Sequence, residues 1–414
     1  MFLHRFKIPW GAVATLAGEG GSRLAVSLFQ FLVANGLGPE KYGTLGITLA
    51  FALLLIPIAD LGLNSLALRY LANNPNPASF RGIIGLKLLS TLLYLFLLGS
   101  LSLLNPIRDT VALGAFLAGV YLAATSLSDF FRQVLRAKES SVLEFKARLF
   151  QIFLFLPACL WFWYVKPGIS ITLLIYCLPA TGLALAYFQT LKKVFNNHLG
   201  PDFTAAWVLL KNHGNFLIQA ILYLALINFS SRLDLWLIDW GVGRASVGYY
   251  FAAYNLVFSG VFFGQALSAH MYPNLHRMGR PIWRLSRALG AHLALALFFL
   301  SGVYLWGESV FRFLFRAKGY SQDHHLFLPL GIILAVSVMN YLWLALLIGQ
   351  HRQWIASVAL IATISLKFYL GKMWVPVYGI EGMLSACLWT EIPICIGMGI
   401  VACSFFLKDN SSRH

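Results

Sequence analysis

The chain has 414 residues, of which 59% are hydrophobic and only 11% are charged. Ordinary soluble domains carry about 25% charged residues, so this composition excludes a soluble globular protein and predicts an all-α polytopic membrane protein. The formal net charge of +16 fits basic loops that face anionic lipid headgroups, and it gives no reason to expect nucleic acid as a partner.

Apolar segments of membrane-spanning length recur along the whole sequence and predict about twelve transmembrane helices. The N-terminus is basic, but too few apolar residues precede Ala12 for a cleaved signal peptide, so we expect a retained first helix. The expected spans are 9–34, 44–67, 83–104, 110–131, 144–165, 168–190, 210–231, 246–270, 287–306, 326–348, 353–374 and 382–406.

The first span contains two opposite charges, Glu19 and Arg23, which are four residues apart and share one helix face. A lone charge at the centre of a span costs about 2.5–3.5 kcal/mol, so we expect the two side chains to pair. This pair either locks the helix to its neighbours or lines a translocation cavity. Near it lie further polar residues, expected on the same face, and glycines that leave room for a helix or a ligand: Thr15, Ser22, Gln30, Gly18, Gly20 and Gly21.

The second and third spans each carry charge near one end. Asp60 and Asn64 are four residues apart, and Asp60 either caps the helix end before Gly62 or faces a cavity. Lys87 lies near the inner end of its span, where the long side chain is expected to extend to the membrane interface.

Polar residues recur at helical spacing in the seventh span, where Lys211, Asn215 and Gln219 follow one another by one turn each. We expect this face to line a pore. In the last two spans, Lys367 lies deep in the membrane and is expected to face a cavity, whereas Glu391, near Pro393, is either a proton site or the partner of Lys367.

The loops show a strong bias in Lys and Arg, which predicts orientation. With the N-terminus inside, 19 basic residues fall on the cytoplasmic side and 9 on the opposite side. Because cytoplasmic loops are enriched in Lys and Arg, both termini are expected in the cytoplasm.

A repeat is visible between "GLGPEKYG" at 36–43 and "GVGRASVG" at 241–248, in which three glycines coincide at a separation of 205 residues. Each copy follows the first helix of a six-helix block, and an even number of helices preserves orientation. The sequence therefore predicts two parallel repeats, an N-terminal lobe over 1–200 and a C-terminal lobe over 201–414.

The segments "LGPEKYG" (37–43), "IADLGL" (58–63) and "RYLA" (69–72) resemble the opening of polysaccharide-transporter flippases. "RLDLWLIDWGVGRASVGYYFAAYNL" (232–256) resembles the start of their second half. These proteins belong to the multidrug/oligosaccharidyl-lipid/polysaccharide exporter superfamily. The resemblance implies two six-helix lobes around a central cavity, and translocation of a polyprenyl-diphosphate-linked glycan across the cytoplasmic membrane by alternating access. It also implies polymerase or ligase proteins as partners.

Three functions are compared. A glycan flippase would bind a diphosphate through Arg23, Lys211 and Lys367, because Arg and Lys donate charge-assisted hydrogen bonds to phosphate oxygens. A multidrug or cation antiporter would use acidic residues such as Glu19 and Asp60. A glycan polymerase or transferase would need a larger outer loop than the sequence offers, so we expect no enzyme activity.

Ion coupling is expected to depend on Glu19, Asp60 or Glu391, among which the sequence does not choose. No cofactor and no metal site is expected. Asp323, His324 and His325 are adjacent in an outer loop and lack metal-ligand spacing. We expect His270 to be an interior residue and the five cysteines to be small core residues.

Overall fold

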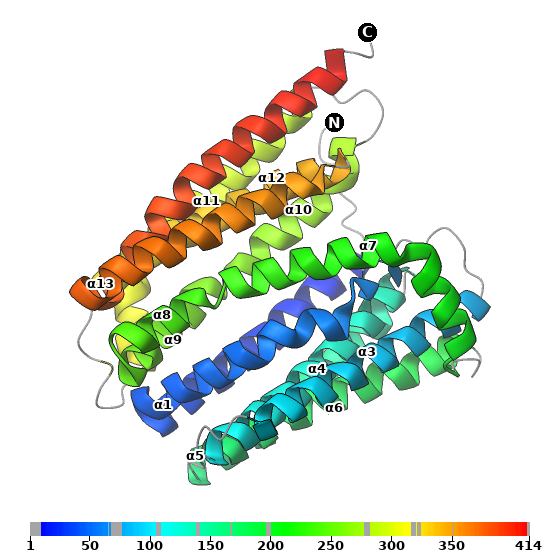
Figure 1. Ribbon diagram of the computed structural model, residues 1–414, viewed down its shortest axis with the longest axis horizontal. Helices are drawn as coiled ribbons and strands as arrows, with labels where there is room; N and C mark the ends of the chain where they lie inside the picture. Colours follow the sequence, from blue (N-terminus) through cyan, green and yellow to red (C-terminus); the bar gives the residue numbers. More distant parts are fainter. Residues whose placement is uncertain are drawn as a thin grey trace. The chain divides into compact units, whose positions relative to one another are not determined.

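The computed structural model describes residues 10–64, 66–67, 77–104, 109–137, 141–165, 168–195, 200–276, 282–315, 320, 324–350 and 352–411. In this part of the chain the secondary structure is helical throughout (Figure 1). The helices are α1 (Trp10–Asp60), α3 (Pro77–Leu104), α4 (Asp109–Ala137), α5 (Ser141–Val165), α6 (Ile169–Val194), α7 (Phe203–Ser230), α8 (Leu233–Gly241), α9 (Arg244–Phe258), α10 (Val261–His276), α11 (Ile282–Leu314), α12 (Phe327–Gly349) and α13 (Gln353–Ser411), with a short 3₁₀ helix η1 (His324–Leu326).

Within these described ranges, 10 helical segments are long and apolar enough to cross a membrane. Two of them, in α1 and α13, are each divided by a non-helical glycine, Gly38 and Gly379 respectively. Each therefore supplies two spans, and the total agrees with the roughly twelve spans that hydropathy predicts. The prediction of an all-α polytopic membrane protein is confirmed.

The chain divides into two compact units. The first contains the described residues up to Leu37 together with Ile47–Asn228, and the second contains Gly38–Gly46 together with the described residues from Phe229 onward. The predicted lobe boundary at residue 200 stays a prediction.

The first unit has a continuous buried core where α4 packs against α6 and α3. Phe80, Phe130, Val134 and Tyr187 are fully buried in it. The start of α7 is attached to α3, because the Asp202 carboxylate caps α7 by accepting from the Ala205 N–H at 2.9 Å, while the Asp202 N–H donates to the Arg81 carbonyl at 3.1 Å. This cap explains why α7 begins at Phe203.

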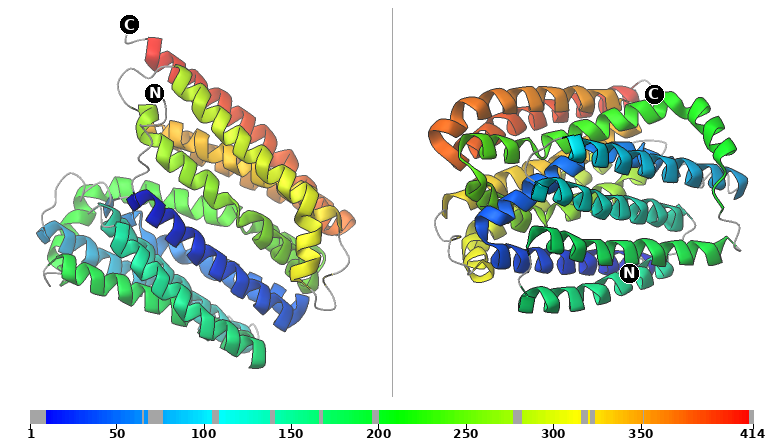
Figure 2. Two further views of the ribbon diagram at one scale, coloured as in Figure 1. Left: turned by 180° about the vertical axis from the view of Figure 1, so that it is seen from behind. Right: turned by 60° about the horizontal axis from the view of Figure 1, so that its bottom comes forward.

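In the second unit, α12 is surrounded by other helices. It packs against α9, α10, α11 and α13, and Figures 1 and 2 show it running beside α11 and α13. Its Leu330, Leu334, Val338, Leu342 and Leu346 follow one another by about one turn and are all fully buried. This spacing places them on one stripe of the helix, which explains the central position of α12 in the unit.

The glycine repeat has a structural counterpart within the second unit. Gly38 (φ 74°, ψ 170°) and Gly243 (φ 112°, ψ 174°) share an extended backbone with positive φ, which favours glycine. A Cβ atom at Gly43 would overlap the Arg244 carbonyl oxygen, and one at Gly248 would overlap the Pro39 carbonyl oxygen. These contacts are reciprocal under the 205-residue separation, as a two-fold axis requires. Gly38 and Gly43 thus correspond to Gly243 and Gly248 in backbone conformation and contacts, and the equivalence of the remaining positions stays a prediction.

Candidate functional site

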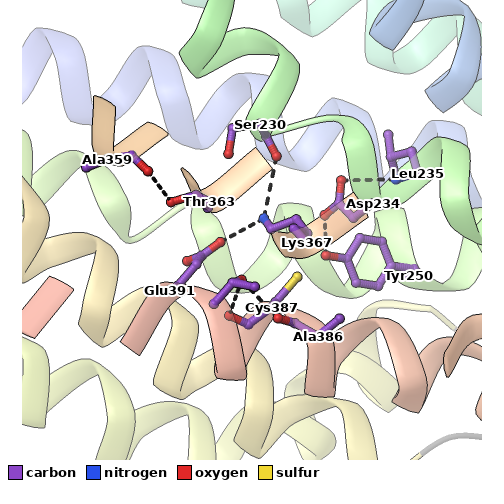
Figure 3. A network of polar contacts seen from close by, with 11 residues as sticks. Ser230, Asp234, Leu235, Tyr250, Ala359, Thr363, Lys367, Ala386, Cys387 and Glu391 are labelled. Atoms are coloured by element: carbon purple, nitrogen blue, oxygen red, sulfur yellow. Dashed lines mark hydrogen bonds and ion pairs between the residues drawn. The ribbon is translucent and has the colours of Figure 1, made fainter. Parts of the chain in front are cut away.

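Lys367 is the centre of a buried polar network in the second unit (Figure 3). Its ammonium donates to Glu391 Oε1 at 2.8 Å and to the Ser230 carbonyl oxygen at 3.5 Å. The side chain of Lys367 is 4% exposed and that of Glu391 is 17% exposed. The structure therefore pairs these two residues, which was one of the two roles considered for Glu391.

The helix breaks explain why these groups meet. Ser230 is the last residue of α7, so its carbonyl lacks the next turn of helix that would donate to it. Lys367 and Glu391 lie on opposite sides of the Gly379 interruption in α13. The lysine thus joins both segments of α13 to the end of α7.

Asp234 is a second acid in the same network and is 4% exposed. It accepts hydrogen bonds from the Tyr250 hydroxyl and, at 3.0 Å, from the Leu235 N–H. Among the described residues, no Lys or Arg lies within ion-pair distance of its carboxylate. Lys367 and Arg232 both act on this carboxylate electrostatically, although neither lies within ion-pair distance of it.

Sequence reasoning missed Asp234 because it placed residues 232–245 in an outer loop. The structure continues the helical, apolar segment to Gly241 with only a short break after Ser230. The signal was the apolar run "LWLIDW" directly after Asp234, which extends the span by about two turns.

Lys87 forms a corresponding cluster in the first unit. Its ammonium donates to the Ala59 carbonyl oxygen at 2.8 Å and to Ser126 Oγ at 2.7 Å, and it lies 3.5 Å from Asp60 Oδ1. Lys87 is 1% exposed. The prediction that this side chain extends to the membrane interface is wrong, because a helix-end carbonyl, a hydroxyl and a carboxylate hold its ammonium inside the protein.

Asp60 ends α1, and the following Leu61 (φ 48°) and Gly62 (φ 70°) adopt left-handed conformations. This turn frees the Ala59 carbonyl and brings Asp60 close to Lys87. Asp60 Oδ1 and Asn64 Oδ1 are buried and accept no hydrogen bond. Asp60 therefore both ends α1 and forms an ion pair with the buried Lys87.

The polar residues of the first span do not share one environment. Ser22 is buried, donates to Gln151 Oε1 and accepts from Arg148 Nη1 at 3.2 Å, so it faces α5. Arg23 is exposed and Gln30 is partly buried. The expectation that Ser22 belongs to the same open face as Arg23 is wrong. The side chains of Glu19 and Thr15 lie outside the described residues. The ion pair between Glu19 and Arg23 and the position of Thr15 on the same face therefore stay predictions.

The glycines of the first span have two different surroundings. A Cβ atom at Gly18 would approach Phe145, and one at Gly21 would approach Ile152, both on α5. Gly20 has no neighbour within 4 Å. The glycines at 18 and 21 thus permit close packing against α5, as predicted for a neighbouring helix.

On α7, the side chains of Lys211, Asn215 and Gln219 are all exposed. Their spacing of four residues places them along one face of the helix, as predicted. The structure does not bring them into the Lys87 network. Whether a ligand binds them stays a prediction.

The remaining sequence predictions concern histidines and an aspartate. Asp323 and the side chains of His270 and His324 lie outside the described residues. His325 is exposed in η1, just before α12.

Comparison with known proteins gives one family. A family model described as "Polysaccharide biosynthesis protein" matches residues 11–278. Among curated proteins, none matches the sequence.

Solved structures share the fold along almost the whole chain. An outward-facing multidrug resistance MATE transporter of the MOP superfamily has a TM-score of 0.72 and 13% identity, covering 96% of this chain and 94% of its own. An inward-facing multidrug resistance MATE transporter of that superfamily has a TM-score of 0.70 and 13% identity, covering 96% of this chain and 98% of its own. The MATE transporter VcmN of Vibrio cholerae in its bent form has a TM-score of 0.66 and 16% identity, covering 97% of both chains. The chain therefore has the two-lobe, twelve-helix fold of these transporters.

Proposed function

Because the chain belongs to the polysaccharide biosynthesis protein family, we propose that it is a flippase for a polyprenyl-diphosphate-linked oligosaccharide. It moves this lipid across the cytoplasmic membrane for cell-surface polysaccharide export, with both termini in the cytoplasm. The observation that carries the proposal is the family match over 11–278 on a chain that has the fold of MATE transporters.

Alternating access is supported by the neighbours. The fold resembles both an inward-facing and an outward-facing MATE structure. One fold thus accommodates opening to either side of the membrane. A parallel repeat, marked here by Gly38 and Gly243, is typical of transporters that work by alternating access.

The substrate is a diphosphate, so cationic side chains are the expected contacts. Arg23 and Lys211 are exposed in the structure, and we assign them to the phosphate groups. Lys367 is held by Glu391, so it takes part only if the substrate or a proton releases it. Gln30, Asn64, Asn215 and Gln219 are proposed to contact the sugars.

Ion coupling is proposed to use the acids of the two buried clusters, Asp60 and Glu391, with Glu19 as a third candidate. A proton at either buried carboxylate would weaken its pairing with lysine, and this change in charge couples protonation to helix position. No enzymatic step is part of the proposal. Membrane lipids and the polymerase or ligase that handles the same glycan are the expected partners.

One observation favours a second function, export of cationic compounds. The Asp234 carboxylate has no Lys or Arg of the described residues within ion-pair distance, and the solved neighbours include multidrug transporters. A cationic substrate would be attracted by such a carboxylate.

Deletion of the gene in its native host distinguishes the two functions. The flippase proposal expects loss of surface polysaccharide, accumulation of the lipid-linked precursor inside, and unchanged efflux of a cationic dye. Reduced dye efflux with normal surface polysaccharide would contradict it and support the second function.

A further inference from the structure

Arg232 is an arginine inside an apolar segment of membrane-spanning length. It lies between the end of α7 at Ser230 and the start of α8 at Leu233, within the segment Phe203–Gly241. The expected spans end at residue 231, whereas the structure continues the apolar helical segment through the nine residues of α8, which follow Arg232 directly. Arginines within spans are rare and mark substrate or ion pathways.

The contacts of Arg232 are aromatic. Its guanidinium carbon lies 5.9 Å from the ring centroid of Phe251 and 5.9 Å from that of Tyr254, both on α9. Among the described residues, its guanidinium has no ion pair, and its Nε is buried without a hydrogen-bond partner. The neighbouring acid, Asp234, is occupied by Tyr250 and the Leu235 N–H.

The guanidinium is therefore without a close partner: Asp234 interacts with it electrostatically, but no carboxylate of the described residues lies within ion-pair distance of it. Cation–π contacts with two rings hold a guanidinium in place, but they do not satisfy its N–H donors. Buried donors are nearly always paired in native proteins, with protein, water or a ligand. The side chain is only partly buried, so an outside group can reach it.

The rings also fix the surroundings of that group. Tyr254 stacks on Phe258 with centroids 4.1 Å apart and an interplanar angle of 10°, and Tyr250 lies 5.9 Å from Tyr254. The three rings form a row along α9, and its middle ring, Tyr254, lies next to the guanidinium. A ligand bound to Arg232 would therefore have an anionic group at the arginine and an apolar surface beside it.

We infer that Arg232 is an oxyanion-binding residue that takes a phosphate group of the carrier lipid, with the partly buried rings of Tyr254 and Phe258 as the adjoining contact surface. This inference rests on the proposed function. It differs from the cationic contacts suggested by sequence, because Lys367 already has a carboxylate partner whereas Arg232 has none in the described part of the chain. Arginine suits the role because its fork binds two phosphate oxygens at once.

The test measures affinity for polyprenyl diphosphate, which lacks sugar, on the full-length protein in lipid nanodiscs. The dissociation constant comes from the ligand-dependent rise in unfolding temperature. Arg232→Gln should weaken binding about 10- to 100-fold, as loss of charged hydrogen bonds predicts, and Arg232→Lys should weaken it less. Inorganic pyrophosphate should compete with the lipid, and the neutral polyprenol should bind without dependence on Arg232.

Arg312→Gln is the matched control, because Arg312 is exposed and pairs with Glu308 at 2.6 Å on the surface of α11. It should bind as the wild type does. Equal weakening in this control, or unchanged affinity in Arg232→Gln, would overturn the inference while the proposed function stands. A wild-type protein that binds no polyprenyl diphosphate would instead refute the proposed function, and the inference with it. If Arg232→Gln does not fold, Tyr254→Leu provides the test, because it removes one of the two rings that hold the guanidinium. This variant should bind pyrophosphate more weakly than the wild type, and unchanged binding would contradict the inference.

Discussion

Lys367 and Glu391, 24 residues apart on the two segments of α13, form a buried ion pair of 2.8 Å. The interruption at Gly379 turns the chain back so that the two helical segments can face each other. The lysine also reaches the last carbonyl of α7. One side chain therefore joins three helical segments.

Removal of one partner of this pair should destabilise the protein strongly. Lys367→Met leaves Glu391 as an uncompensated buried charge, which typically costs about 3–5 kcal/mol. Thermal unfolding of the purified protein in detergent should show a clear drop in melting temperature. The double variant Lys367→Met with Glu391→Leu should recover much of the loss, and a double variant as unstable as the sum of the single variants would contradict the pairing.

Lys87→Met should act similarly in the first unit. It removes one of the two donors to the Ala59 carbonyl and leaves the Asp60 carboxylate without its ion-pair partner, and an unpaired buried acceptor costs about 1–3 kcal/mol, more when it is charged. Lys211→Met is the control, since Lys211 is exposed. We expect a lower unfolding temperature only for Lys87→Met. Equal stability of the two variants would mean that Lys87 is not buried in the membrane-embedded protein.

The close backbone contacts of Gly43 and Gly248 give a third prediction. Gly43→Ala and Gly248→Ala each place a methyl group against a backbone carbonyl, of Arg244 and Pro39 respectively. Because backbone cannot move aside as a flexible side chain can, each should cost about 1–3 kcal/mol or more. Gly20→Ala meets no neighbour within 4 Å and should leave the unfolding temperature unchanged or raise it. A Gly248→Ala variant as stable as Gly20→Ala would contradict the close contact between Gly248 and the Pro39 carbonyl.

Orientation is tested by labelling cysteines introduced into a cysteine-free background. Lys193 lies in the last turn of α6 on the predicted cytoplasmic side, and Tyr378 is exposed next to Gly379 on the predicted outer side. A membrane-impermeant thiol reagent added to whole spheroplasts should label Tyr378→Cys and leave Lys193→Cys unlabelled. Permeabilised membranes should label both. The opposite pattern in intact cells would reverse the topology.

The sequence predicted the helices, the repeat and the family resemblance because these depend on local composition and spacing. Hydropathy reveals a span wherever it lies, and Gly38 and Gly243 carry a conformation that few other residues adopt. The Lys367–Glu391 pair was considered because both residues lie deep in adjacent spans.

The positions of Lys87, Asp234 and Arg232 were not predictable in the same way. Lys87 is near a span end in the sequence, and only the turn at Leu61 and Gly62 brings acceptors to it. Asp234 and Arg232 depend on a short helix break after Ser230, which a hydropathy window reads as the end of the span. Ser22 and Arg23 are adjacent, yet one faces α5 and the other is exposed. Such differences arise from packing between distant helices, which spacing along one helix does not reveal.

The flippase function is tested most directly in proteoliposomes that contain the purified protein and a fluorescent oligosaccharide linked to polyprenyl diphosphate. A reductant that cannot cross the bilayer bleaches only the outward-facing label. The proposal predicts that the wild type makes nearly all of the label accessible, that Arg23→Ala slows this more than Arg23→Lys, and that protein-free liposomes protect about half. Protection of half of the label by the wild-type protein, with or without an ion gradient, would contradict the proposed function.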